Sequence, residues 1–265
     1  MTPTLLRAPF FEDRGMNSHS SALVIVPTYN EAENLGPLVS AILALDDKFD
    51  ILIIDDNSPD GTGKIADHLA AEWPELHVLH RPGKLGLGTA YVEGFHWAIE
   101  QGYDYIFEMD CDFSHDPNYL PRFLQEIGSA DLVLGSRYVK GGDTPNWGPL
   151  RRIVSASGNL FARFMLGLKT HDCTGGFRCY RRTMLQRIPW DMIRLQGYGF
   201  QVGAVYFVER LGGCVVELPI IFQDRRVGKS KMSFKIVSEA FGYVIRLALS
   251  EKCGRNIQLA RSETL

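Results

Sequence analysis

The chain has 265 residues, of which 45% are hydrophobic and 22% are charged, and its formal net charge is −3. These values are typical of a globular protein with a packed core, and they argue against nucleic-acid binding, which usually leaves a basic excess. No apolar stretch reaches the roughly 18–20 residues needed to cross a bilayer. The five cysteines lack zinc-site spacing and favour a reducing compartment over a disulfide framework.

The predicted elements alternate between strands and helices over the first half of the chain. Short apolar runs indicate buried strands, and longer segments between them indicate helices. The predicted strands are 22–27, 51–54, 76–79, 105–109 and 132–134, and the predicted helices are 31–45, 63–73, 88–101 and 117–127. This is the pattern of βαβ units, and it predicts an α/β fold with a mainly parallel twisted sheet and flanking helices.

The alternation stops after residue 140. Residues 151–168 and 233–249 have the apolar spacing of amphipathic helices, and residues 213–222 indicate a strand or hairpin. Each amphipathic helix could pack against the core, which is the commoner outcome, or lie at a membrane surface. Residues 1–20 carry no signal-peptide pattern, so we expect tails at 1–20 and 251–265 around a single domain spanning 21–250.

Polar clusters follow the predicted strands. They lie at 28–31, 55–60, 82–88 and 110–116, and at Arg137. Ligands of parallel α/β sheets bind beyond the carboxyl ends of the strands, so these clusters predict one active site at that edge.

Asp110 and Asp112 are the strongest candidates for a metal site. Two carboxylates at a strand end can hold Mg²⁺ or Mn²⁺, which prefer oxygen ligands and often accompany phosphates. Such an ion would neutralise charge on a leaving nucleoside diphosphate. Such a pair is common, and taken alone it is better explained as two solvated side chains at a strand end.

Two further clusters fit a nucleoside. Asp55 and Asp56 can present a carboxylate to a base or ribose, although an acidic turn that caps a helix would look the same. Tyr29 offers a ring for stacking, and Glu31 could bind a ligand or simply stabilise a helix N-terminus.

Basic residues complete the predicted site. Arg137, Arg225 and Lys231 are candidate phosphate ligands, although basic loops are usually just solvated. The loop at 81–88 fits neither a phosphate-binding P-loop nor a dinucleotide fingerprint, and we expect it to be a flexible loop near the nucleotide. His115 and His171 are expected in surface or capping roles.

Seven motifs occur in order: PTYNEAENL, IIDDNSPDGT, RPGKLGLGTA, DCDFSHDP, GSRY, TGGFRCYRR and DRRVGKSK. Together they resemble the dolichol-phosphate mannose synthases, a branch of the family 2 inverting glycosyltransferases, from Ala22 to Leu249. The resemblance implies a Rossmann-like GT-A fold. It also implies that the guanosine part of the donor is bound by Pro27, Tyr29, Glu31, Ile54 and Asp56.

The same resemblance assigns the charged groups. Asp110, Cys111 and Asp112 would bind the diphosphate and metal, with Cys111 contributing its backbone. Ser114 stands where some members have a metal-binding Gln, and a water could take its place. Arg137, Arg225 and Lys231 would bind phosphate, and Asp112, Arg225 and Lys231 would act most directly in catalysis.

The implied reaction is inverting transfer of mannose from GDP-mannose to a polyprenyl phosphate. A phosphate monoester is largely dianionic at pH 7, so the nucleophile needs no general base. The protein would be cytoplasmic and peripheral at the cytoplasmic face of a membrane, where a separate membrane partner protein could assist.

Three other functions fit less well. They are transfer from a UDP-sugar, such as polyprenyl-phosphate glucosylation, a non-catalytic nucleotide-binding scaffold, and a nicotinamide-dependent oxidoreductase. The last is disfavoured because no glycine fingerprint follows residues 22–27.

Overall fold

A seven-stranded sheet runs through the protein. The computed structural model describes residues 22–193, 197–224 and 234–252. The strand order is β3-β2-β1-β4-β6-β5-β7, and among these strands β6 alone is antiparallel to its neighbours. The strands are β1 (Ala22–Thr28), β2 (Asp50–Asp55), β3 (Leu76–His80), β4 (Tyr105–Glu108), β5 (Leu132–Ser136), β6 (Arg178–Arg181) and β7 (Val215–Pro219). The predicted α/β fold with a mainly parallel sheet is confirmed.

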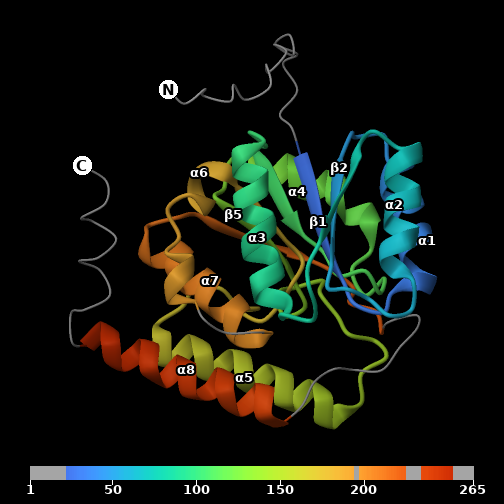
Figure 1. The fold of residues 1–265 in the computed structure, drawn as a ribbon. Helices are drawn as coiled ribbons and strands as arrows, with labels where there is room; N and C mark the ends of the chain where they lie inside the picture. Colours follow the sequence, from blue (N-terminus) through green and yellow to red (C-terminus); the bar gives the residue numbers. More distant parts are fainter. Residues whose placement is uncertain (1–21, 194–196, 225–233, 253–265) are drawn as a thin grey trace, which may run out of the picture.

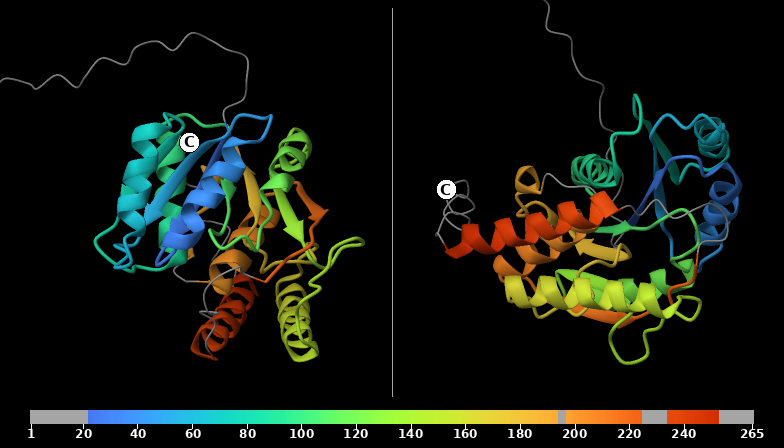
Figure 2. Two further views of the ribbon diagram at one scale, coloured as in Figure 1. Left: turned by 90° about the vertical axis from the view of Figure 1, so that its right-hand side faces the viewer. Right: turned by 90° about the horizontal axis from the view of Figure 1, so that it is seen from below.

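Helices cover both faces of the sheet (Figure 1). Helices α1 (Ala32–Leu43), α2 (Thr62–Glu72) and α4 (Leu120–Ile127) pack on one face, and α3 (Leu87–Glu100) and α7 (Tyr198–Arg210) pack on the other. A 3-10 turn, η1 (Pro117–Tyr119), leads into α4. Helices α5 (Pro149–Leu166) and α8 (Phe234–Lys252) run side by side below the sheet in Figures 1 and 2. None of the helices in the described ranges is long and apolar enough to cross a membrane.

The central strand β1 divides the core between the two faces. Leu23 and Ile25 face the α3 side, whereas Val24 and Val26 face the α1 side, and all four are fully buried. This alternation follows from the two-residue period of a strand, and burial on both faces explains the continuous apolar run in the sequence.

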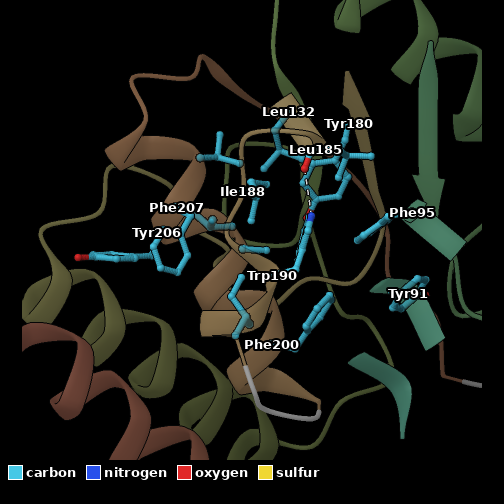
Figure 3. Packing of buried hydrophobic residues seen from close by; sticks show 14 of the residues in the cluster. Tyr91, Phe95, Leu132, Tyr180, Leu185, Ile188, Trp190, Phe200, Tyr206 and Phe207 are labelled. Carbon is cyan, nitrogen blue, oxygen red and sulfur yellow. Dashed lines mark hydrogen bonds between the residues drawn. The ribbon is translucent and has the colours of Figure 1, made fainter. Parts of the chain in front are cut away.

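An aromatic cluster fills the α3 side (Figure 3). The ring centroids of Phe95 and Trp190 are 4.8 Å apart, and those of Trp190 and Phe200 are 5.8 Å apart. Trp190 lies in a short 3-10 turn, η2 (Trp190–Met192), and its Nε1 donates to the Leu185 carbonyl at 3.0 Å. Leu185 ends the short helix α6 (Arg182–Leu185), so the cluster anchors the chain between β6 and α7.

Neither β6 nor α7 was predicted from the sequence. Strand β6 enters the sheet between β4 and β5, and its sequence RCYR has neither an apolar run nor a simple polar alternation. Helix α7 has almost no solvent-facing side, because Phe200 to Val208 are buried, so it lacks the polar stripe that reveals an amphipathic helix.

Gly94 sets the distance between α3 and the sheet. A Cβ at this position would lie 2.9 Å from Ile25 Cδ1, Ile25 Cγ2 and Ile54 Cδ1. We therefore expect Gly94→Ala to lower the free energy of unfolding by about 1–3 kcal/mol, because α3 or the isoleucines must shift. The control is Gly36→Ala in α1, where nothing lies within 4 Å, and it should be neutral or stabilising by up to about 1 kcal/mol. Denaturant unfolding measures both, and equal stability of the two variants would contradict the close packing.

Candidate active site

The predicted clusters meet at the carboxyl edge of the sheet, where the strand order reverses. From β1 the chain proceeds outward through β2 and β3, and then returns to place β4 on the other side of β1. Such a switch point is the usual ligand site of an open α/β sheet. It collects the loops that follow β1, β2 and β4.

The two acids that follow β2 have different partners. Asp55 accepts hydrogen bonds from Thr28 Oγ1 at 3.0 Å, Ser58 N at 3.0 Å and Ser58 Oγ at 2.6 Å. It therefore ties the β1 and β2 loops together. Asp56 instead pairs with Arg81: the distance from Asp56 Oδ1 to Arg81 Nη1 is 3.0 Å, and the Asp56 side chain is 9% exposed. The structure assigns Asp55 to the scaffold and leaves Asp56 as the candidate for ligand binding.

The β1 loop is fixed to the start of α2. Glu31 N donates to Thr62 Oγ1 at 2.9 Å, and Ala32 N donates to Asp60 Oδ2 at 3.1 Å. Burial alone would raise the pKa of Asp60, but hydrogen bonds from Thr62 and Ala32 outweigh it and lower that pKa. A charged Asp60 thus holds the backbone beside Glu31, whose Oε2 accepts from Asn34 Nδ2 at 2.9 Å.

The remaining nucleoside candidates lie beside these loops. Pro27 is in register with Ile54 on the neighbouring strand, so the two residues share the sheet edge. The Ile54 side chain is fully buried in the core, which leaves its backbone as the part that can meet a ligand. Lys84 Nζ lies 4.4 Å from the centre of the Tyr29 ring.

The loop after β4 holds Asp110 and Asp112 in a defined shape. Ser114 donates to Asp112 Oδ1 through its backbone N at 3.0 Å and through Oγ at 2.6 Å. Phe113 has a φ of +61°, a left-handed conformation that is uncommon for a residue with a side chain. The Cys111 side chain is buried in the core, so this residue presents its backbone to the site. Ser114 orients a carboxylate here, and its predicted metal contact stays a prediction.

His115 is buried, so the expectation of a surface role was wrong. Its ring stacks on Phe177 with centroids 5.0 Å apart, and Nδ1 accepts from the Asp110 N–H at 3.2 Å. Burial, with a smaller contribution from Arg137, lowers the pKa of His115 to about 4, although Asp112 and Asp172 oppose the shift. The neutral ring therefore braces the Asp110 backbone. His171 is half-exposed and pairs with Glu217, as expected for a surface residue.

Arg137 is held by Asp172, a residue that was not predicted. Arg137 Nε and Nη2 contact the two carboxylate oxygens of Asp172 at 2.7 and 2.6 Å, and Nη2 also donates to Thr174 Oγ1 at 2.9 Å. Burial would raise the pKa of Asp172, but the Arg137 charge and hydrogen bonds outweigh it and lower that pKa. The bidentate pair orients the guanidinium that the sequence assigned to phosphate.

A second buried arginine supports the loop behind this pair. Arg178 donates to the carbonyls of Cys173, Gly175 and Gln201 at 2.8–3.0 Å. Gln201 Nε2 in turn donates to Glu108 at 2.8 Å, and burial raises the pKa of Glu108 to about 7. The TGGF segment is thereby tied to β4 and α7. No residue spacing in the sequence predicted that Arg178 would support this segment.

The acidic pair fits a metal ion that is shared with a substrate. Within the ranges that the structure describes, no group of three or more His, Cys, Asp or Glu side chains is arranged for a metal. Mg²⁺ and Mn²⁺ commonly take one or two carboxylates and complete their shell with water and phosphate oxygens. Asp110 and Asp112 match that demand. Arg225 and Lys231 lie outside the described residues.

Comparisons with known proteins identify the family of the chain. Residues 23–188 match the family described as Glycosyl transferase family 2. The chain is 49% identical over 230 residues to an undecaprenyl-phosphate mannosyltransferase of Micrococcus luteus, covering 87% of this chain and 95% of that protein. It is 46% identical over 220 residues to a polyprenol monophosphomannose synthase of Mycolicibacterium smegmatis, covering 82% and 83%.

Solved structures share the fold at low identity. A glucosyl-3-phosphoglycerate synthase of Mycobacterium tuberculosis in complex with UDP aligns with a TM-score of 0.63 and 16% identity, covering 90% of this chain and 86% of that one. A mannosyl-3-phosphoglycerate synthase of Rubrobacter xylanophilus aligns at 0.62 and 19%, covering 92% and 76%. The fold is that of the GT-A glycosyltransferases. The chain belongs to glycosyl transferase family 2.

The Arg137–Asp172 pair predicts a pH-dependent stability. Asp172→Asn removes the countercharge of a buried arginine, and we expect it to lower the free energy of unfolding at pH 7 by about 3–5 kcal/mol. Because the folded pKa of Asp172 is lowered, its contribution is complete above the unfolded pKa of about 3.9 and is lost as pH falls through the folded pKa. The gap between wild type and variant should therefore close below about pH 4.

Denaturant unfolding at a series of pH values measures this gap. The matched control is Asp224→Asn, because the Arg151–Asp224 pair has side chains that are 37% and 42% exposed. This control should change the free energy of unfolding by less than about 1 kcal/mol. An Asp172→Asn variant as stable as wild type at pH 7 would show that Arg137 does not depend on its partner.

Proposed function

We propose that this protein transfers mannose from GDP-mannose to a polyprenyl phosphate and inverts the anomeric configuration. The observation that carries the proposal is sequence identity over most of the chain. The chain is 49% identical to a protein named as an undecaprenyl-phosphate mannosyltransferase and 46% identical to one named as a polyprenol monophosphomannose synthase. The switch-point site supports it, because nucleoside, diphosphate and acceptor groups have candidate residues on adjacent loops.

The donor nucleoside is assigned to the β1 and β2 loops. Tyr29 provides a ring for the base, and Asp56 provides a carboxylate for a base N–H or a ribose hydroxyl. Glu31 is held near the start of α1 by its contact with Asn34. Pro27 and Ile54 are paired at the ends of β1 and β2 and are assigned to the same nucleoside subsite. This assignment places the diphosphate beside the β4 loop.

The diphosphate is assigned to Asp110, the Cys111 backbone and Asp112, together with Mg²⁺ or Mn²⁺. A bound ion would offset the charge that develops on the leaving GDP. Ser114 and His115 keep the acidic loop in place through the contacts described above. Arg137, with Arg225 and Lys231, is assigned to the phosphate groups, where cations reduce repulsion between an anionic nucleophile and an anionic donor.

The lipid acceptor is assigned to a membrane surface beneath α5 and α8. Helix α5 exposes apolar side chains at helical spacing, and α8 adds Phe241, Ile245 and Leu249 next to it. Those of α5 are Leu150, Ile153, Val154, Leu160 and Phe164. An apolar stripe of this kind suits the boundary between headgroups and acyl chains. Peripheral binding at the cytoplasmic face, with or without a membrane partner protein, follows from the proposal.

We expect Asp112→Asn to lower mannose transfer by about a hundredfold or more, because it removes a charge at the leaving group. The amide oxygen can still accept from Ser114, so the loop should keep its shape. The control is Asp116→Asn, which retains the cap at Asn118 N and should transfer mannose at close to the wild-type rate. The assay follows labelled mannose into polyprenyl phosphate in detergent, with and without divalent metal.

The same assay tests the donor and the reaction class. Metal-dependent labelled lipid from GDP-mannose supports the proposal. Product from a UDP-sugar alone would keep the glycosyltransferase class and replace the donor. Turnover of Asp112→Asn at the wild-type rate, at saturating metal, would remove the metal assignment.

The membrane assignment predicts a loss of vesicle binding. We expect Leu160→Gln combined with Phe164→Gln to weaken binding to vesicles of phosphatidylglycerol and phosphatidylcholine about tenfold or more, because two apolar side chains no longer enter the bilayer. The control is Trp73→Gln, which removes a 45% exposed apolar side chain at the end of α2. Co-sedimentation measures both, and equal binding by the two variants would refute the α5 surface.

A further inference from the structure

The loop between β3 and α3 is anchored by a buried arginine. Arg81 directly follows β3, and its backbone N donates to the Asp55 carbonyl at 2.8 Å. Its side chain is only 2% exposed. A guanidinium is always charged and is costly to bury, so its partners show what it holds in place.

Those partners belong to two different parts of the site. Arg81 Nη1 lies 3.0 Å from Asp56 Oδ1, and Nε lies 3.3 Å from Glu93 Oε2. Arg81 Nη2 donates to Thr89 Oγ1 at 2.6 Å, and Nη1 donates weakly to the Gly86 carbonyl at 3.4 Å. One side chain therefore fixes both an acid at the end of β2 and the turn that begins α3.

The contact with Asp56 is electrostatic rather than a directed hydrogen bond. Among the described residues, no donor is aligned with the buried Asp56 Oδ1 for a hydrogen bond, despite the short distance to Arg81. The arginine thus holds Asp56 in place without using this oxygen as a hydrogen-bond acceptor. A carboxylate held in this way suits a nucleoside N–H or hydroxyl group as its donor.

The loop side of the anchor reaches the other predicted nucleoside contact. Gly86 has a φ of +105° and a ψ of 152°, a conformation that is essentially restricted to glycine. Thr89 Oγ1 closes the turn on the Leu85 and Gly86 carbonyls at 3.1 and 2.8 Å. The same loop carries Lys84 to 4.4 Å from the Tyr29 ring centre. The expected flexible loop is therefore tied down at both of its ends.

We propose that Arg81 is a positioning residue of the donor nucleoside subsite. It holds Asp56 on one side and the 81–86 loop above Tyr29 on the other, so that both are in place before the nucleotide binds. This inference rests on the proposed function, which assigns the nucleoside to Tyr29 and Asp56. Arg81 acts on donor affinity through these groups and takes no part in the chemical step.

The test measures nucleotide affinity and the split between KM and kcat. We expect Arg81→Gln to raise the Kd for GDP, and the KM for GDP-mannose, about tenfold to a hundredfold, with kcat within a few-fold of wild type. Arg81→Lys should bind GDP more tightly than Arg81→Gln and less tightly than wild type, because it keeps the positive charge but lacks the several N–H donors of the guanidinium. Calorimetric titration with GDP and steady-state kinetics provide these values.

A double-mutant cycle distinguishes positioning from general stabilisation. If Arg81 acts through Asp56, then Arg81→Gln should add little to the loss of GDP affinity in an Asp56→Asn background. Independent, additive losses would overturn the inference. The control is Asp67→Asn, which breaks the half-exposed His80–Asp67 pair next to Arg81 in sequence and should leave GDP affinity unchanged.

Parallel titrations with UDP separate this inference from the choice of donor. If wild type binds UDP and not GDP, and Arg81→Gln weakens UDP, then the donor proposal fails and the role of Arg81 stands. Unchanged nucleotide affinity in a folded Arg81→Gln or Arg81→Lys variant overturns the role of Arg81 alone. Failure of wild type to bind either nucleotide overturns both. If Arg81→Gln does not fold, two other variants provide the same test. Arg81→Lys alters the contact with Asp56, and Thr89→Ala removes the contact between Arg81 and the loop.

Discussion

Parallel strands bring their carboxyl ends to one edge of a sheet, and this constraint determines where the candidate groups that follow β1, β2 and β4 lie. Because β1 sits between β2 and β4, the residues that follow these three strands become neighbours although they are up to about eighty residues apart in the chain. The strands themselves are apolar and buried on both faces, so they contribute rigidity. The charged and polar candidate residues therefore lie in the loops, which begin at the ends of these strands.

Buried ion pairs then make these loops rigid. Arg81 with Asp56 fixes the loop after β2, and Arg137 with Asp172 fixes the loop after β5. Arg178 holds the TGGF segment through main-chain carbonyls. A buried pair contributes little net stability compared with apolar packing, but removing one partner is expensive. Such pairs therefore suit a site whose geometry must be preserved.

The strands with continuous apolar runs, and the polar clusters that follow them, could be predicted from the sequence. A buried strand is visible as a run of apolar residues, and each cluster directly follows its strand in the chain. The sequence did not predict β6 or α7, since a strand with an RCYR sequence and a helix without a polar face lack the usual periodicity. His115 and Asp172 were missed for a different reason. Their roles depend on contacts across the fold, with Asp110 and Arg137, that no spacing reveals. The same holds for the Arg81 anchor.

The exposed helix α5 is connected to the segment that follows Arg137. Tyr138 follows Arg137, and its hydroxyl donates to Ser155 Oγ in α5 at 2.7 Å. At the start of the helix, Arg152 donates to the Thr144 and Trp147 carbonyls at 2.6 and 3.2 Å. A phosphate whose chain stays in a bilayer can meet a donor at the sheet edge only if the helix that docks on lipid keeps a fixed distance from that edge. If α5 docks on lipid, as proposed, the Tyr138–Ser155 contact joins this helix to the loop after β5 and so limits the height of the site above the lipid.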